Sequence, residues 1–111
     1  MVEEATIRDI DELEPLAREV MEALREVRDP ELGMNIVDLG LVYNVEVEDD
    51  EALVTMTLTS PGCPAGGEIL QNSQEQAESV EGIEAADVNL VWKPFWTPDR
   101  IDDEVRATLG I

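Results

Sequence analysis

The sequence predicts a two-layer α+β domain in the order α-β-β-α-β-α, with a small mixed sheet. Three observations lead to this fold class. The 111 residues are 43% hydrophobic, which is enough for one buried core. Apolar residues recur at helical spacing near the N-terminus and alternate in two later runs. Two further segments open on a proline that suits a first helical turn, so helices and strands share one small fold.

The first helix is predicted over about residues 13–27, where apolar residues recur three and four positions apart. This stripe consists of Leu13, Leu16, Ala17, Val20, Leu24 and Val27. Either Asp11 caps the helix, with Glu14 closing a capping box, or Glu14 caps it with Pro15 in the first position. Pro30 ends the segment, because the residue before a proline is steered out of the helical region.

Two alternating runs around the acidic turn 48–51 predict a β-hairpin. In the first run one face is expected to carry Leu41, Tyr43, Val45 and Val47. In the second run the inward side chains are expected to be Val54, Met56 and Leu58. The outward side chains of that run are expected to be Thr55, Thr57 and Thr59.

A second helix is predicted over about 64–80 and a third strand over 85–92, a strand–helix–strand link that normally forms a right-handed crossover. The apolar face of this helix is thin and consists of Ile69, Leu70, Ala77 and Val80, with Ser73 between them. A last helix is expected to open at Pro98 and end at Gly110, capped by Thr97 and lined by Ile101, Val105 and Leu109. We assign residues 12–111 to the domain and 1–11 to an acidic N-terminal extension.

The charge balance is strongly acidic, with 27 Asp and Glu against seven Lys and Arg and a net charge of −20. Such a surface repels nucleic-acid phosphates and anionic membranes, so neither is expected as a partner. Because the acidic residues are spread along the whole chain, we interpret them as an adaptation to a salt-loving source. An acidic docking surface for a basic partner is the alternative. With no bilayer-length apolar run, no secretory pattern and one cysteine, the expected location is the cytoplasm.

The lone cysteine, Cys63, is predicted to lie at the N-cap or in the first turn of the second helix. Unpaired N–H groups and the positive end of the helix dipole favour a thiolate there. A buried structural cysteine is the competing interpretation, because free cysteines are among the most buried residues. The chain has no histidine and no second cysteine, which excludes a Cys–His nucleophile pair and a dithiol redox mechanism within one chain.

Two other stretches are candidates for function. Asp29, Glu31 and Asp38 place three carboxylates in a short connection, although an Asp-Pro turn and side chains that satisfy loop backbone groups, Asn35 included, explain them as well. The second stretch gathers three aromatic residues, Trp92, Phe95 and Trp96. We expect Trp92 to close the core, while Phe95 and Trp96 either pack or form an interaction patch.

Three motifs together resemble one known family. They read V-R-D-P-E-L with N-I-V-D-L-G-L-V-Y, then T-S-P-G-C-P, then W-K-P-F-W-T-P-D-R-I. In this combination they are similar to the SufT/PaaD-like metal–sulfur cluster biosynthesis domain, an iron–sulfur cluster assembly family whose relatives include the eukaryotic cytosolic iron–sulfur targeting subunit. The resemblance spans roughly residues 13–110 and implies a small α+β domain, the fold class that the pattern predicts.

The resemblance implies a pocket built from the first two motifs. Its expected cofactor-binding residues are Asp29, Glu31, Leu32, Asp38, Thr59, Ser60 and Cys63. In the family the cysteine is tied to cluster maturation, so Cys63 is the expected metal ligand and no residue is expected to be catalytic. Iron–sulfur clusters usually take four thiolates, whereas one chain offers one and a homodimer two. The expected cluster is therefore transient and shared between chains or with a partner.

The resemblance implies a maturation factor that carries or delivers iron–sulfur clusters to apoproteins and is not an enzyme. Its expected partners are other iron–sulfur assembly proteins and client apoproteins, with a homodimer left open. The domain also occurs fused ahead of P-loop ATPases; this sequence has no such motif, so an ATPase would be a separate partner. The alternatives are an adaptor that recruits clients without using the cysteine and a PaaD-like accessory subunit of an oxygenase complex. PaaD-type proteins usually add a cysteine-rich C-terminal segment, and none is present here.

The charge of the chain predicts that salt stabilises the fold. Screening of the self-repulsion at about 2 M KCl should raise the thermal unfolding midpoint relative to about 0.1 M KCl, as measured by circular dichroism. Equal midpoints at the two concentrations would contradict the salt-loving interpretation.

Overall fold

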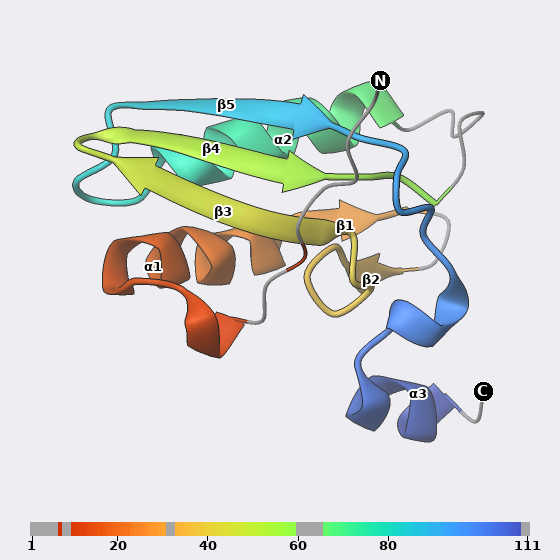
Figure 1. The fold of residues 1–111 in the computed structure, drawn as a ribbon. Coiled ribbons are helices and arrows are strands. Elements are labelled where there is room, and N and C mark those ends of the chain that lie inside the picture. The colour runs from red at the N-terminus through yellow and green to blue at the C-terminus, as the bar shows by residue number, and fades with distance from the viewer. Residues whose placement is uncertain (1–6, 8–9, 31–32, 60–65, 110–111) are drawn as a thin grey trace.

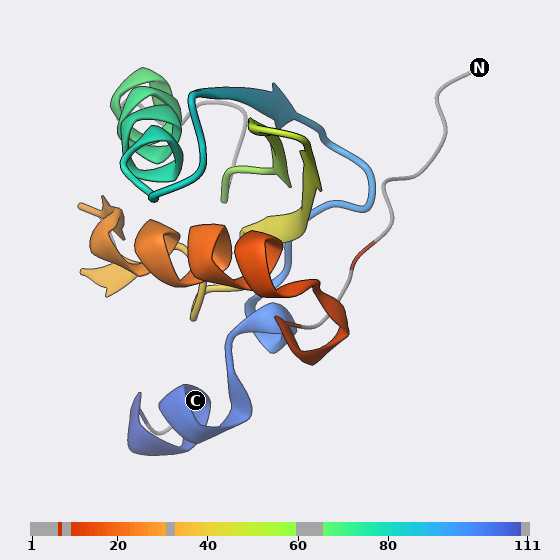
Figure 2. The same ribbon diagram turned by 90° about the vertical axis from the view of Figure 1, so that its left-hand side faces the viewer.

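Two helices cover one face of a three-stranded sheet in the computed structural model of this chain (Figures 1 and 2). The model describes residues 7, 10–30, 33–59 and 66–109. The sheet order is β3-β4-β5, with β3 antiparallel and β5 parallel to β4. The sheet strands are β3 (Val42–Glu48), β4 (Glu51–Met56) and β5 (Ala85–Leu90), and the two helices are α1 (Pro15–Ala23) and α2 (Gly66–Glu78). The predicted fold class, a two-layer α+β domain with a small mixed sheet, is confirmed.

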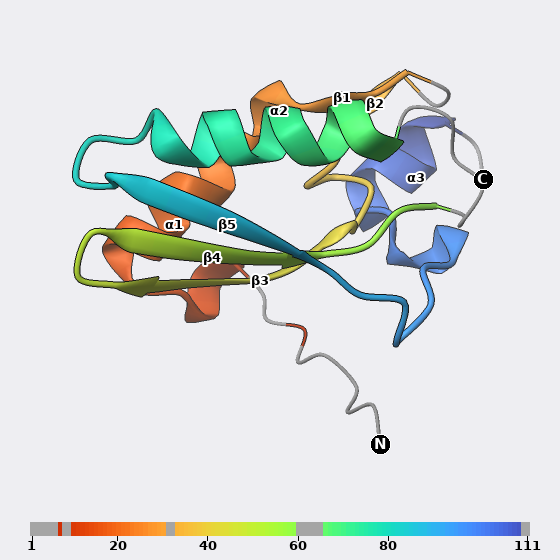
Figure 3. The same cartoon turned by 90° about the horizontal axis from the view of Figure 1, so that it is seen from above.

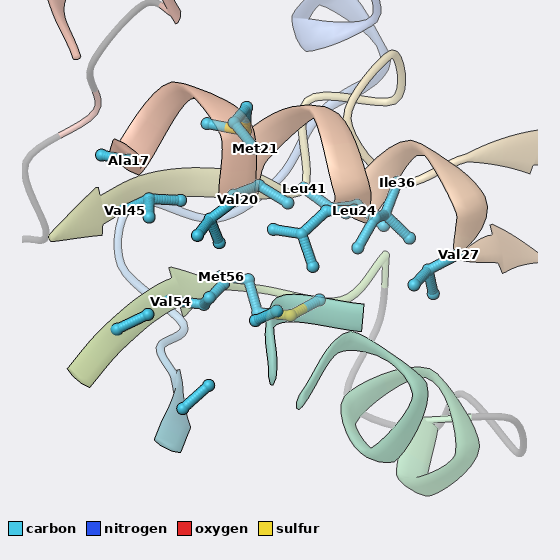
Figure 4. Close-up of a cluster of buried hydrophobic side chains, with 14 of the residues drawn as sticks. Ala17, Val20, Met21, Leu24, Val27, Ile36, Leu41, Val45, Val54 and Met56 are labelled. Atoms are coloured by element: carbon cyan, nitrogen blue, oxygen red, sulfur yellow. The ribbon is translucent and has the colours of Figure 1, made fainter. Parts of the chain in front are cut away.

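Helix α1 begins as the second of the two predicted starts, with Glu14 at the N-cap and Pro15 in the first turn. It follows a short 3-10 helix, η1 (Ile10–Glu12), and runs on into another, η2 (Leu24–Glu26). The apolar stripe faces the sheet, and Figure 4 shows Val20 and Leu24 directed toward the side chains of β4. Both are fully buried. The periodicity in the sequence therefore identified the face that forms the core.

The side chains predicted for the inner face of β3 are buried at Leu41, Tyr43 and Val45, but a β-bulge interrupts the alternation. Val42 pairs with Met56 and Asn44 with Thr55, so the register shifts between them and Tyr43 is the extra residue. Tyr43 is completely buried, but its hydroxyl leaves the main core and donates a hydrogen bond of 2.6 Å to the Pro94 carbonyl. A bulge adds one residue to one strand and redirects a side chain, which period-two counting does not anticipate.

A two-stranded hairpin precedes the main sheet and was not predicted. Its strands, β1 (Arg28–Asp29) and β2 (Met34–Asn35), pair antiparallel around the turn that contains Pro30. The Gly33 N–H donates to the Asp29 carbonyl at 2.8 Å, and the Arg28 Nη1 donates to the Gly33 carbonyl at 3.1 Å. Two residues per strand are too few to produce an alternation in the sequence, so a tight connection was all that could be anticipated.

Helix α2 carries the thin apolar face that the sequence predicts. Ile69, Ser73 and Ala77 are buried against the sheet, and the Ser73 hydroxyl donates to the Ile69 carbonyl at 2.7 Å. This bond within the helix satisfies the one polar group on the buried face. The predicted start at Pro64 lies outside the described residues. Beyond the helix, the chain returns as β5 beside β4, as the strand–helix–strand pattern predicts.

The single C-terminal helix that the sequence predicts is divided in two. A 3-10 helix, η3 (Pro98–Arg100), with Thr97 at its N-cap precedes α3 (Asp103–Leu109). Ile101 between them has an extended backbone, with ψ of 139°, and its side chain is 6% exposed. Burial of this one side chain outweighs continuation of the helix, which is a tertiary effect.

The segment from Trp92 to Trp96 packs against the hydrophobic core through its two tryptophans. Trp92 and Trp96 are half-buried against the core, and the Trp96 Nε1 donates to the Leu39 carbonyl at 2.6 Å. Phe95 between them is 61% exposed.

Thr57, predicted to face solvent, is instead fully buried. None of the helices in the described part of the chain is long and apolar enough to cross a bilayer.

Two leucines provide a matched test of which sheet face forms the core. Leu24→Ala removes a fully buried side chain and should lower the free energy of unfolding by about 2–5 kcal/mol. Leu53→Ala on the opposite face, 37% exposed, should cost under about 1 kcal/mol. Urea unfolding of both variants measures the difference. A similar loss for both would contradict the one-sided core.

Candidate functional site

The first predicted site residue with a described structure is Asp29, on β1. Asp29 is completely buried, and its backbone carbonyl closes the turn by accepting a hydrogen bond from the Gly33 N–H. Its neighbours in the motif, Glu31 and Leu32, lie outside the described residues. A carboxylate at zero exposure is unusual in a chain whose acidic residues otherwise face solvent. Asp29 is therefore a structural residue of the hairpin and not a solvent-exposed surface carboxylate.

The second motif begins at Thr59, which is half-buried just beyond β4. Ser60 and Cys63 lie outside the described residues, but the structure defines the residues on both sides of them. Leu58 is 6% exposed, and a Cβ built on Gly66 would lie 2.8 Å from its Cδ1. The first turn of α2 thus packs directly on Leu58, and a side chain at position 66 would require the end of the Leu58 side chain to shift. We call residues 60–65 the cysteine segment; the residues that flank it, Leu58 and Gly66, are in contact.

The described parts of the two motifs lie at the same end of the fold. Figures 1 and 3 show the β1–β2 hairpin and the first turn of α2 at the end where β4 and β5 finish. Helix α2 also contacts η2, which leads directly into β1. The N-terminal end of a helix carries partial positive charge from unpaired N–H groups. A thiolate or another anion near the start of α2 would be stabilised by that charge.

Asp38 has a different environment, because both of its carboxylate oxygens are engaged by its own chain. Arg25 of η2 forms an ion pair with Oδ1, and the Asn35 amide donates to Oδ2 at 2.9 Å. The Asp38 N–H donates to the Asn35 Oδ1 at 2.9 Å, and its carbonyl accepts the Asp102 N–H at 2.8 Å. The prediction that these side chains satisfy loop backbone groups is confirmed for Asn35, whereas the Asp38 carboxylate engages two side chains. Asp38 joins three segments of the chain.

Asp38 also lines a pocket of about 590 Å³ between α1, the loop before β3 and the C-terminal segment. Arg25 and Arg100 contribute its positive charge, and Asp99, Asp102 and Asp103 contribute further carboxylates. Neither Asp29 nor Thr59 lines this pocket. The predicted site residues therefore divide between two places: the hairpin with the flanks of the cysteine segment, and the Arg25–Asp38 pocket.

Gly40 shows how closely the C-terminal segment approaches this pocket. Its φ is +78°, and a Cβ at this position would lie 2.4 Å from the carbonyl oxygen of Arg100. A side chain is thus excluded both by backbone conformation and by space. The Arg100 guanidinium in turn lies over the ring of Tyr43, 5.4 Å from its centroid. This is the geometry of a cation–π contact.

Sequence reasoning missed Arg25 and Arg100 as site residues. Each belongs to a different element from the group that it contacts, so no local spacing marks the pair. The chain has only seven basic residues, so each arginine was a candidate for a specific contact with a carboxylate. This scarcity was the signal that could have identified them. Within the described ranges, no group of three or more His, Cys, Asp or Glu side chains is arranged to hold a metal ion.

The fold and the site define a small α+β protein in which the hairpin with buried Asp29 and the start of α2 lie at the same end. The family model of the iron–sulfur cluster assembly protein matches residues 17–90. The crystal structure of a domain of unknown function, DUF59, from Bacillus anthracis superposes with a TM-score of 0.80 at 39% identity, covering 86% of this chain and 92% of that one.

Relatives of known name agree with this family. The chain is 41% identical over 93 residues to a Porphyromonas gingivalis protein named Fe-S protein maturation auxiliary factor. The matched region covers 83% of this chain and 89% of the relative. It is 44% identical over 86 residues to the Staphylococcus aureus Fe-S protein maturation auxiliary factor SufT, covering 77% of this chain and 98% of the relative. The chain belongs to the iron–sulfur cluster assembly protein family.

The phenol of Tyr43, which is buried beside Arg100, is expected to lose its proton at a higher pH in the folded protein than in the unfolded chain. Burial raises the pKa of Tyr43 above its ordinary value of about 10, against the lowering effect of the Arg100 charge. Because the fold favours the neutral phenol, its contribution to stability is complete below about pH 10 and is lost as the pH rises through the folded pKa. Tyr43 is the only tyrosine, so tyrosinate absorbance reports it alone.

The native protein should titrate at a higher pH than the protein in denaturant, and Arg100→Gln should raise the native midpoint further. Circular dichroism recorded in parallel confirms that the fold persists over the range used. A native midpoint at or below that of the unfolded chain would show that the phenol is not buried.

Proposed function

We propose that this protein is an auxiliary factor in the maturation of iron–sulfur proteins and that it carries or delivers clusters through Cys63. The observation that supports this most strongly is its 44% identity to a SufT maturation factor across 98% of that relative. The relatives described above are named as auxiliary factors and not as enzymes. Delivery by a protein of this kind requires binding and release of a cluster, without turnover of a metabolite.

The chemistry available to Cys63 fits a carrier better than a storage protein. A thiolate at a helix start is favoured by the helix dipole, and thiolates are the usual ligands of iron–sulfur clusters. One chain supplies one such ligand, so the remaining ligands come from a second copy or from the client. A cluster held by so few ligands of one chain is readily transferred. The cluster is therefore cargo and not a resident cofactor.

The other predicted site residues are assigned different roles. Asp29 and Thr59, at the end of the fold where the cysteine segment begins, shape access to Cys63 together with Glu31, Leu32 and Ser60. Asp38 acts as a positioning residue, because Arg25 and Asn35 already engage its carboxylate. Its role in this proposal is to hold the loop before β3 against η2.

The proposed partners follow from the cluster as cargo. Client apoproteins accept it, and other iron–sulfur assembly proteins supply it. A separate P-loop ATPase is a further proposed partner, as is a second copy of this chain that would supply the second thiolate. We propose the cytoplasm as the location, because cluster transfer between labile thiolate ligands requires reducing conditions.

A second candidate function is an adaptor that recruits clients without cluster ligation by Cys63. The observation that favours it is the exposure of Phe95, at 61%, between two half-buried tryptophans. An exposed aromatic side chain held by packed neighbours is a suitable interface anchor. In this case a Phe95→Ser substitution would abolish client capture while substitution of the cysteine would not.

Anaerobic reconstitution distinguishes the two functions. With ferrous iron, sulfide and a thiol reductant, the protein should develop visible charge-transfer absorption, and Cys63→Ser should lose it. When an apo-ferredoxin is added, its own absorption should appear at the expense of the carrier's. Asp38→Asn, which weakens the contact with Arg25, serves as the control and should retain the absorption even where its stability falls by about 1 kcal/mol.

Complementation provides the second readout. Cells that lack the endogenous factor should regain iron–sulfur enzyme activity with the natural sequence and fail to do so with Cys63→Ser. Full rescue by the serine variant would refute delivery through the cysteine. In that case loss of client capture by Phe95→Ser would establish the adaptor.

A further inference from the structure

None of the helices in the described part of the chain covers the face of the sheet opposite α1 and α2. Figures 2 and 3 show α1 and α2 on the other side. We call this surface the open face and define it by the outward residues of β3, β4 and β5. They are Asn44, Glu46, Glu48, Glu51, Leu53, Thr55, Ala85, Asp87 and Asn89. A sheet in a two-layer domain has one such face, and its composition shows what the surface suits.

An apolar side chain lies at the centre of the open face. Leu53 is 37% exposed, and its cross-strand neighbours are Glu46 on β3 and Asp87 on β5. Glu48 and Glu51 form the adjacent row toward the hairpin turn. Four carboxylates thus surround one exposed leucine. Apolar centres with a charged rim are typical of protein–protein contact surfaces.

The strands that form this surface carry no basic residue. No Lys or Arg occurs in the sequence between Arg28 and Lys93, and that span includes the entire sheet. None of the ion pairs in the described part of the chain involves a residue of the open face. The basic residues occupy positions 8–28 and 93–106 of the sequence. The acidic residues are spread along the whole chain, but on the open face they have no ion-pair partner among the described residues.

Asn44 supplies an independent observation on the same face. Asn44 is 5% exposed, and its Nδ2 donates a hydrogen bond to the Glu46 Oε1 at 3.2 Å. Its Oδ1 accepts no hydrogen bond from the described residues. A buried carbonyl oxygen without a donor is costly, and only a rearrangement of this side chain on binding would bring it a donor. The exposed Glu46 carboxylate beside it accepts directly from an ammonium or guanidinium group.

The charge selects among the possible occupants. A second copy of this face would bring carboxylate against carboxylate, and nucleic acid or an anionic membrane would be repelled likewise. Strand addition at the β5 edge is impeded, because the Ala86 N–H that points outward already donates to Glu78 at 3.3 Å. A cationic small molecule would neutralise the carboxylates and leave Leu53 exposed. A basic protein segment with an apolar side chain satisfies both features.

We propose that the open face docks a basic amphipathic segment of a partner protein, with Leu53 as the apolar anchor and Glu46, Glu48, Glu51 and Asp87 as the charged rim. The surface is distinct from the cysteine segment. Leu53 precedes Thr59 by six positions on the same chain, about 20 Å of extended backbone. A partner bound here leaves the Cys63 end of the molecule accessible. The proposal does not depend on cluster binding by Cys63.

The test uses the full chain and a synthetic helical peptide of leucine and lysine, with its leucines on one face. Titration is followed by NMR of the labelled protein, at the lowest KCl concentration at which circular dichroism shows the native fold. Amide shifts should concentrate on β3, β4 and β5. The double variant Glu46→Gln/Asp87→Gln should weaken binding about tenfold. Leu53→Ser should weaken it severalfold with no change in charge.

A matched control separates a specific surface from general attraction to an acidic protein. Glu26→Gln/Glu75→Gln changes the net charge by the same amount at exposed positions on helical segments, and should alter the affinity less than about twofold. Equal losses from the two double variants would overturn the proposal. So would shifts confined to α1 or α2, spermine binding as tightly as the peptide, or a dimer whose interface maps to the open face.

Discussion

Burial of one face of a three-stranded sheet under α1 and α2 is the constraint on which the rest of the structure depends. A small sheet is stable only when its apolar face is buried, so the apolar stripe of α1, with Val20 and Leu24 at zero exposure, packs against β3 and α2. This packing positions η2 so that Arg25 reaches Asp38. The close contact of Gly66 with Leu58 places the start of α2, and with it one end of the cysteine segment.

The C-terminal segment is the second structural determinant, although the family model ends at residue 90. Tyr43 donates to Pro94, Trp96 donates to Leu39, and the Asp102 N–H donates to Asp38. These bonds attach the segment to the loop before β3 and form one wall of the Arg25–Asp38 pocket. The bulge at Tyr43 belongs to the same arrangement, because it turns the phenol toward this segment. A local irregularity of β3 thus serves a long-range contact.

The two proposed functional regions are separated along β4. Residues 60–65 follow this strand in the sequence, and their described flanks lie at the same end of the fold as the hairpin that contains Asp29, while the open face is centred on Leu53 near the start of β4. A maturation factor must hold a client and present a cluster to it, and separate surfaces allow the two to occur together. The proposed roles remain independent, since each rests on its own residues and has its own test.

The sequence by itself determined the fold class, the order of the main elements, the core face of α1 and the family. These properties depend on period, on proline and glycine positions and on motifs, all of which are local. Only the tertiary structure decided the bulge at Tyr43, the burial of Thr57, the division of the last helix at Ile101 and the pairing of Arg25 with Asp38. Each of these arises from contact between residues distant in the chain, where burial or a hydrogen bond outweighs the local preference. The acidic open face of the sheet is of the same kind, because strand pairing is what brings its carboxylates around one leucine.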